Sequence, residues 1–185
     1  MTTICVYRTD ERIIVVGDTN YQEDGKNYQG QSKLIRFPDN KGVITYCGNV
    51  RVGTLLAENY QHIADVINDG VCSIYEMASF FKELLEDDGM FEDENEKNTE
   101  DIREFTILIV TGGEIWIFDA FFSAMKLQED FFSMGSGSAY AYGAYSAIVS
   151  RVENFTKGDL EGVMNIASFN DTATRRPFDF VEVES

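Results

Sequence analysis

The chain has 185 residues, and its 32 acidic and 15 basic side chains give a formal net charge of −17 at pH 7. So strong an acidic excess argues against nucleic acid or an anionic membrane as a partner. A hydrophobic content of 44% with only two prolines is typical of a globular protein with a sizeable core, and the length fits a single domain over residues 1–185.

The cysteines and the histidine give no sign of a metal site. Cys5, Cys47 and Cys72 are odd in number and scattered, which favours buried thiols in a reducing compartment. His62, the only histidine, lies in a predicted helix, which argues against a Ser/His/Asp triad. No apolar run reaches about eighteen residues and the N-terminus lacks a signal-peptide pattern. We therefore expect a soluble, cytoplasmic protein without a metal ion or cofactor.

Short strands are expected in the first quarter of the chain. Two runs rich in Ile and Val, Thr3 to Arg8 and Arg12 to Gly17, predict an antiparallel hairpin. The polar stretch from Tyr21 to Gln31 predicts a loop. Two more strands are expected at residues 33–37 and 43–47.

From Arg51 the apolar residues recur at helical spacing, which predicts a helix that ends near Ile67. A second helix should begin at Ser73, with Glu76 three residues later completing a capping box. Residues 86–104 are mostly acids, amides and lysines and predict a solvated surface loop, with an acidic recruitment surface as the alternative.

The second half repeats this order of elements. Strands at 105–110 and 114–121, joined by two glycines, predict a hairpin, and a less regular strand region follows over 124–132. Two helices at 139–147 and 160–167 and a last strand at 177–183 complete the chain. This order predicts an α+β fold, a four-layer αββα sandwich with two antiparallel sheets between helix layers.

The first residues suggest a nucleophile. Thr2 has a small side chain, so Met1 can be removed, and removal leaves a hydroxyl and a free α-amine on one residue. Such an amine titrates near ~8 in model peptides, so it can take the proton while the hydroxyl attacks. A threonine at position 2 is common, however, and the chemistry also needs a carboxylate, a lysine and an oxyanion donor.

Six short segments, each weak alone, stand in a specific order and spacing. They are Thr2–Ile4, Gly17–Asp18, Ser32–Ile35, Tyr46–Gly48, Gly135–Gly143 and Asn170–Thr174. In these segments the chain resembles the proteasome β-subunit and HslV-type peptidases, which are N-terminal-nucleophile hydrolases. The resemblance spans nearly the whole chain, and it implies the same αββα sandwich.

The resemblance implies a role for each matching residue. Thr2 matches the N-terminal nucleophile, and Lys33 matches the lysine whose ammonium depresses the pKa of the neighbouring amine. Asp18 matches the carboxylate that pairs with this lysine. Gly48 matches the glycine whose backbone N–H is the oxyanion donor, a contact worth ~3 kcal/mol in the transition state.

Three further matches surround the nucleophile's amine. Ser136 matches the serine beside this amine, and Asp171 with Thr174 matches the Asp-x-x-Ser motif that orders the amine and its water. Threonine in place of serine keeps the hydroxyl, whereas Arg175 replaces a glycine that usually follows.

The resemblance also implies contacts with substrate. Tyr46, two residues before Gly48, matches the floor of the side-chain pocket, and Val50 matches its wall. A tyrosine floor predicts a shallow, apolar pocket and a preference for small or medium apolar side chains. The expected substrate-binding residues are Tyr21, Gln22, Tyr46, Asn49 and Val50.

The sequence therefore predicts a threonine endopeptidase that cleaves peptides or unfolded proteins. By resemblance it forms a homo-oligomeric ring and works with an ATP-dependent unfoldase, and apolar side chains around Phe80, Phe81, Phe121 and Phe122 are expected at its interfaces. The alternative is a catalytically inactive scaffold or binding protein of the same fold, in which Met1 is retained.

Overall fold

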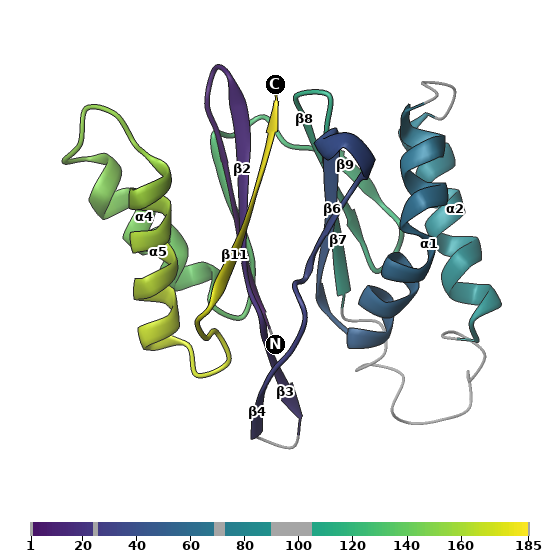
Figure 1. The fold of residues 1–185 in the computed structure, drawn as a ribbon, viewed down its shortest axis with the longest axis horizontal. Helices are drawn as coiled ribbons and strands as arrows, with labels where there is room; N and C mark the ends of the chain where they lie inside the picture. Colours follow the sequence, from purple (N-terminus) through teal and green to yellow (C-terminus); the bar gives the residue numbers. More distant parts are fainter. Residues whose placement is uncertain (1, 24–25, 69–72, 90–104, 185) are drawn as a thin grey trace. The chain divides into compact units, whose positions relative to one another are not determined.

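A computed structural model describes residues 2–23, 26–68, 73–89 and 105–184 (Figure 1). The chain divides into two compact units, one formed by residues 1–34 and 129–185 and the other by residues 35–128. Among the described residues, each unit contains an antiparallel sheet and two α-helices. No helix in these ranges is long and apolar enough to cross a membrane.

The first unit is built on a four-stranded sheet that contains both the N-terminal and the C-terminal strand. The predicted N-terminal hairpin is confirmed, with Ile4 opposite Gly17 and Val6 opposite Val15. Its Ile- and Val-rich strands are almost fully buried, and each of them also pairs with a further strand on its other edge. In spatial order the strands are β10 (Phe131–Gly135), β1 (Thr3–Arg8), β2 (Arg12–Asp18) and β11 (Phe178–Glu184).

Two helices cover one face of this sheet, α4 (Ser138–Val149) and α5 (Lys157–Asn170), as Figure 1 shows. Their buried side chains form one cluster with Cys5, Ile14 and Val16 of the sheet. Both helices were predicted, although each extends beyond its predicted bounds. Burial raises the pKa of Cys5 to about 12, so this thiol is inert.

The stretch from Tyr21 to Gln31 is not a simple loop, and that prediction was wrong. It contains a second hairpin, formed by β3 (Asn20–Glu23) and β4 (Lys26–Gln29), in which Tyr21 lies opposite Tyr28. Polar residues hide the pattern on which strand prediction relies. The repeated triplet Asn-Tyr-Gln, at 20–22 and again at 27–29, was the available signal, because it places the two aromatic rings opposite each other.

The second unit contains a five-stranded antiparallel sheet. A 3₁₀ turn, Pro38–Asn40, joins its first two strands. At the predicted hairpin, Gly112 and Gly113 have φ values of 53° and 74°, which a two-residue turn of this kind requires. In spatial order the strands are β5 (Leu34–Arg36), β6 (Gly42–Gly48), β7 (Phe105–Thr111), β8 (Glu114–Asp119) and β9 (Ala124–Lys126).

Helices α1 (Val50–Asn68) and α2 (Ile74–Asp87) pack on this sheet through a large apolar cluster. The predicted capping box is present, since the Ser73 hydroxyl accepts from the Glu76 N–H and the Glu76 carboxylate accepts from the Ser73 N–H. The expectation of an apolar surface is only partly met. Phe121 is 80% exposed, but Phe81 is fully buried because it faces the sheet and packs edge-on against Phe118.

Apart from the β3–β4 hairpin, the order of strands and helices follows the prediction in the described ranges. Cys5 and Cys47 are buried thiols. Cys72 and residues 90–104 of the predicted surface loop lie outside the described residues.

Candidate active site

The start of the N-terminal strand lies beside the end of β10. Thr2 is buried, and its carbonyl oxygen accepts a hydrogen bond of 2.9 Å from the Ser136 N–H. Gly135 makes this approach feasible. Its φ is +92°, and a Cβ at this position would lie 1.9 Å from the Thr2 oxygen, so only glycine fits.

A buried ion pair lies next to this strand. The Lys33 ammonium is 3.0 Å from the Asp18 carboxylate, and the two side chains are 1% and 0% exposed. The second carboxylate oxygen accepts from the Thr3 N–H at 2.8 Å, and the Asn20 N–H donates at 3.0 Å to the oxygen that also binds Lys33. The Asp18–Lys33 ion pair is therefore hydrogen-bonded to Thr3, the residue that follows Thr2.

Burial raises the pKa of the Asp18 carboxyl, while Lys33 and the backbone donors Thr3 and Asn20 act in the opposite direction. Each member of such a buried pair depends on the other, because removing either one leaves an uncompensated buried charge.

Asn20 connects the ion pair to the loop after α5. Its carbonyl accepts a short hydrogen bond from the Lys33 ammonium, and its side-chain amide donates to the Ala173 carbonyl at 2.7 Å. The ring of Tyr21 lies over the same ammonium, with its centroid 5.0 Å from Nζ.

A second cluster surrounds the carboxylate of Asp171, just after the end of α5. The Ser136 and Thr174 hydroxyls both donate to it, at 2.7 Å and 2.6 Å, and the Ala173 N–H donates at 3.2 Å. Partial burial acts to raise the pKa of Asp171, but the bonds from Thr174 and Ser136 outweigh it and hold this pKa below its ordinary value.

Thr3 joins the two clusters. Its backbone N–H donates to Asp18, and its hydroxyl makes a short hydrogen bond to the Thr174 hydroxyl. Each hydroxyl carries one hydrogen, and that of Thr174 goes to Asp171, so the Thr3 hydroxyl must donate to Thr174. The Gly137 N–H in turn donates to the Thr3 oxygen at 3.1 Å.

Six of the predicted catalytic residues thus lie in the first unit, and backbone and side-chain hydrogen bonds connect them: Thr2, Asp18, Lys33, Ser136, Asp171 and Thr174. Sequence reasoning missed Thr3 and Asn20. A hydroxyl in an otherwise apolar strand was the available signal for Thr3. Asn20 acts largely through its backbone, so its side-chain type gave no signal.

The second unit contains four more predicted site residues, Gly48, Tyr46, Asn49 and Val50. Gly48 ends β6 with a φ of +97°, which favours glycine, and Tyr46 is only 4% exposed. The Tyr46 ring lies against Gly53 of α1, where a Cβ would come within 1.8 Å of it. Val50 is half exposed, and the Asn49 side chain accepts from the Arg51 N–H at 2.8 Å. The side chain of Gln22 lies outside the described part of the chain.

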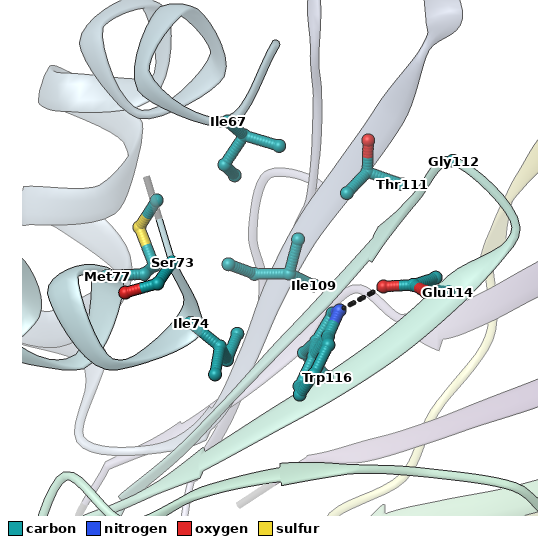
Figure 2. A pocket seen from close by; sticks show the side chains of 9 residues that line it. All are labelled: Ile67, Ser73, Ile74, Met77, Ile109, Thr111, Gly112, Glu114 and Trp116. Carbon is teal, nitrogen blue, oxygen red and sulfur yellow. Dashed lines mark hydrogen bonds between the residues drawn. The ribbon is translucent and has the colours of Figure 1, made fainter. Parts of the chain in front are cut away.

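The second unit also has a pocket of about 370 Å³ between the helices and the β7–β8 hairpin (Figure 2). Ile67, Ile109 and Trp116 provide apolar walls, and the indole N–H of Trp116 donates to Glu114 at 3.0 Å. Glu114 also pairs with Lys126, so its charge is compensated. The pocket lining does not include Gly48, Tyr46, Asn49 or Val50.

The chain resembles known proteins in its fold but not in its sequence. No protein-family model matches the chain, and no curated protein matches its sequence. The fold, however, is similar to that of eukaryotic HslV from Trypanosoma brucei, with a TM-score of 0.72, 17% identity and 99% of each chain covered.

Two other solved structures are similar over most of their length. BPH from Thiobacillus denitrificans, in complex with epoxomicin, has a TM-score of 0.74 at 17% identity and 98% coverage of both chains. Anbu, an ancestral β-subunit from Yersinia bercovieri, has a TM-score of 0.72 at 13% identity, covering 98% of this chain and 81% of its own. These matches confirm the predicted fold class and support the resemblance to HslV and proteasome-like proteins at the level of fold.

Proposed function

We propose, from a fold shared with HslV and BPH, that the chain is a threonine endopeptidase whose nucleophile is Thr2 after removal of Met1. One observation carries this proposal. The buried Asp18–Lys33 pair is hydrogen-bonded to the residue that follows Thr2, while Ser136 holds the Thr2 carbonyl and binds Asp171. A charged pair with no catalytic task would be an expensive feature in a small core.

In the proposed reaction the free α-amine of Thr2 accepts the hydroxyl proton as Oγ1 attacks the carbonyl carbon of the peptide bond. The tetrahedral intermediate collapses, the C–N bond breaks, and the amine gives its proton to the departing amino group. Water then attacks the ester with the same amine as base, which releases the carboxylic acid and restores Thr2.

The neighbouring residues assist in different ways. The Lys33 ammonium favours the neutral form of the amine and stabilises negative charge on the hydroxyl oxygen, and Asp18 keeps Lys33 charged and fixed. Asp171 orients the Ser136 and Thr174 hydroxyls beside the amine. By resemblance, the Gly48 N–H stabilises the oxyanion.

Epoxomicin provides a direct test, because BPH is known in complex with it. It is an epoxyketone, with two electrophilic centres that a hydroxyl and a free amine on one residue can both attack. We expect one adduct per chain on the processed protein and none on Thr2→Ala. Ser79→Ala, which removes an exposed hydroxyl from α2, is the matched control and should be labelled normally.

The proposal includes a cytoplasmic homo-oligomeric ring that degrades peptides or unfolded proteins supplied by an ATP-dependent unfoldase. Light scattering tests this part, and a stable monomer at micromolar concentration would contradict it. Retention of Met1 with no adduct would instead support an inactive scaffold of the same fold.

A further inference from the structure

The Lys33 ammonium is covered by an aromatic ring. Two of its three N–H groups bind the Asp18 carboxylate and the Asn20 carbonyl, and the Tyr21 ring lies over it at 5.0 Å. A cation at this distance from a ring is attracted to the ring's negative face, and the attraction is strongest where water is excluded. Lys33 is only 1% exposed, so this condition holds.

Gly30 makes room for the ring. A Cβ on Gly30 would lie 1.9 Å from Cε2 and 2.0 Å from Cδ2 of Tyr21, so the ring rests directly on the glycine backbone. That backbone is fixed in turn, because the Gly30 N–H donates to the Thr19 carbonyl at 2.8 Å. The ring therefore contacts both the Lys33 ammonium and a backbone segment that a hydrogen bond holds in place.

The hairpin offers an internal comparison. Tyr28 lies opposite Tyr21 in the β3–β4 pair, yet its side chain is 51% exposed. Of these two cross-strand tyrosines, only Tyr21 has its ring over Lys33. The difference separates the effect of the ring on Lys33 from the effect of an aromatic side chain on hairpin stability.

We propose that Tyr21 is a positioning residue that covers the Lys33 ammonium and fixes its direction, and that Gly30 is the residue that admits the ring. A lysine side chain has four rotatable bonds, and an ammonium open to water is screened and mobile. With the ring in place, the charge of Lys33 acts on its neighbours through a medium from which water is excluded. This inference rests on the proposed role of Lys33 beside Thr2, but the contact itself can be tested without any activity.

Covering can be measured chemically. The full chain is treated briefly with acetic anhydride, and acetylation of Lys33 is followed by mass spectrometry, with the exposed Lys41 as internal reference. Tyr21→Ala should raise the Lys33 rate by about tenfold, and Tyr21→Phe, which keeps the ring, should restore slow acetylation. Tyr28→Ala should leave the rate unchanged.

Gly30→Ala provides a second, independent variant. The new methyl group must displace the Tyr21 ring, so this variant should expose Lys33 as Tyr21→Ala does. In the double variant the two effects should not add, because the ring that the methyl group displaces is already gone. Additive effects would mean that Gly30→Ala acts through the hairpin backbone, and they would overturn the assignment of Gly30.

The kinetic consequence is a loss of turnover rather than of binding. Tyr21→Ala should lower kcat on a short fluorogenic peptide by about tenfold with little change in KM, and Tyr21→Phe should recover it. Unchanged acetylation with a raised KM would make Tyr21 a substrate contact only and would overturn the proposal. Exposure of Lys33 without loss of kcat would refute the positioning role. If the processed wild-type chain has no activity, the proposed function fails, while the acetylation rates still decide whether Tyr21 covers Lys33.

Discussion

The hydroxyl of Thr3 should stabilise the protein and order the candidate site, and Thr3→Val tests both effects. Valine has nearly the same shape as threonine, so the substitution removes the hydroxyl without leaving a cavity around this fully buried side chain. The Gly137 N–H then loses its acceptor, and Thr174 loses the donor that fixes the direction of its own hydrogen.

An unsatisfied buried N–H costs about 1–3 kcal/mol. For a domain of this length a loss of about 2 kcal/mol lowers Tm by about 4–8 °C. Thr3→Ser is the matched control, because it keeps the hydroxyl and loses only a buried methyl group, at about 1 kcal/mol. Thermal unfolding at equal protein concentration measures both variants.

Peptide hydrolysis should follow the hydroxyl and not the methyl group. We expect Thr3→Val to lose most of its activity, because Asp171 and Thr174 are no longer held in one arrangement, and Thr3→Ser to keep more of it. The reasoning is refuted if Thr3→Val is as stable as the wild type while Thr3→Ser is clearly less stable.

Three further substitutions probe the same site, and one of them has a matched control outside it. Lys33→Met should abolish hydrolysis. It should also lower the free energy of unfolding in urea by about 3–5 kcal/mol, because it leaves Asp18 buried and unpaired. A loss below about 1 kcal/mol would show that Asp18 is readily solvated. Gly135→Ala should displace the Thr2 carbonyl and destabilise the chain strongly. The control, Gly143→Ala, lies in the middle of α4 with open space around it and should stabilise the chain by up to about 1 kcal/mol. Equal effects of the two substitutions on stability would contradict the close approach at Gly135. Because the folded-state pKa of Asp171 is lowered, its contribution to stability is present above the ordinary aspartate pKa and is lost as pH falls through the lowered value. Asp171→Asn should therefore show a shallower loss of stability in acid than the wild type, as followed by urea denaturation from pH 5 downwards, and identical slopes would exclude this role.

Local signals in the sequence were sufficient for most elements. The Ser73–Glu76 capping box and the Gly112–Gly113 turn depend on residues within a few positions of each other, so the sequence predicts them directly. The β3–β4 hairpin was missed because its strands are polar and short, and pairing across the hairpin, not an apolar face, defines them.

The candidate site also contains residues that local sequence signals indicate and contacts that they do not. Matching segments indicated Asp18, Lys33 and Asp171, but no local pattern indicates that the Thr3 hydroxyl meets that of Thr174, which is 171 positions away in the chain. The ring of Tyr21 over Lys33 likewise depends on the absence of a side chain at Gly30. Contacts of this kind become visible only in the folded chain.

The most direct test of the proposed function is the intact mass of the purified chain before and after incubation with epoxomicin, for the wild type and for Thr2→Ala. We expect the wild type to lack Met1 and to gain the mass of one epoxomicin on Thr2, while Thr2→Ala gains none. A wild-type chain that retains Met1 and gains no mass, or a Thr2→Ala chain that is labelled as fully as the wild type, would contradict the assignment of Thr2 as the nucleophile.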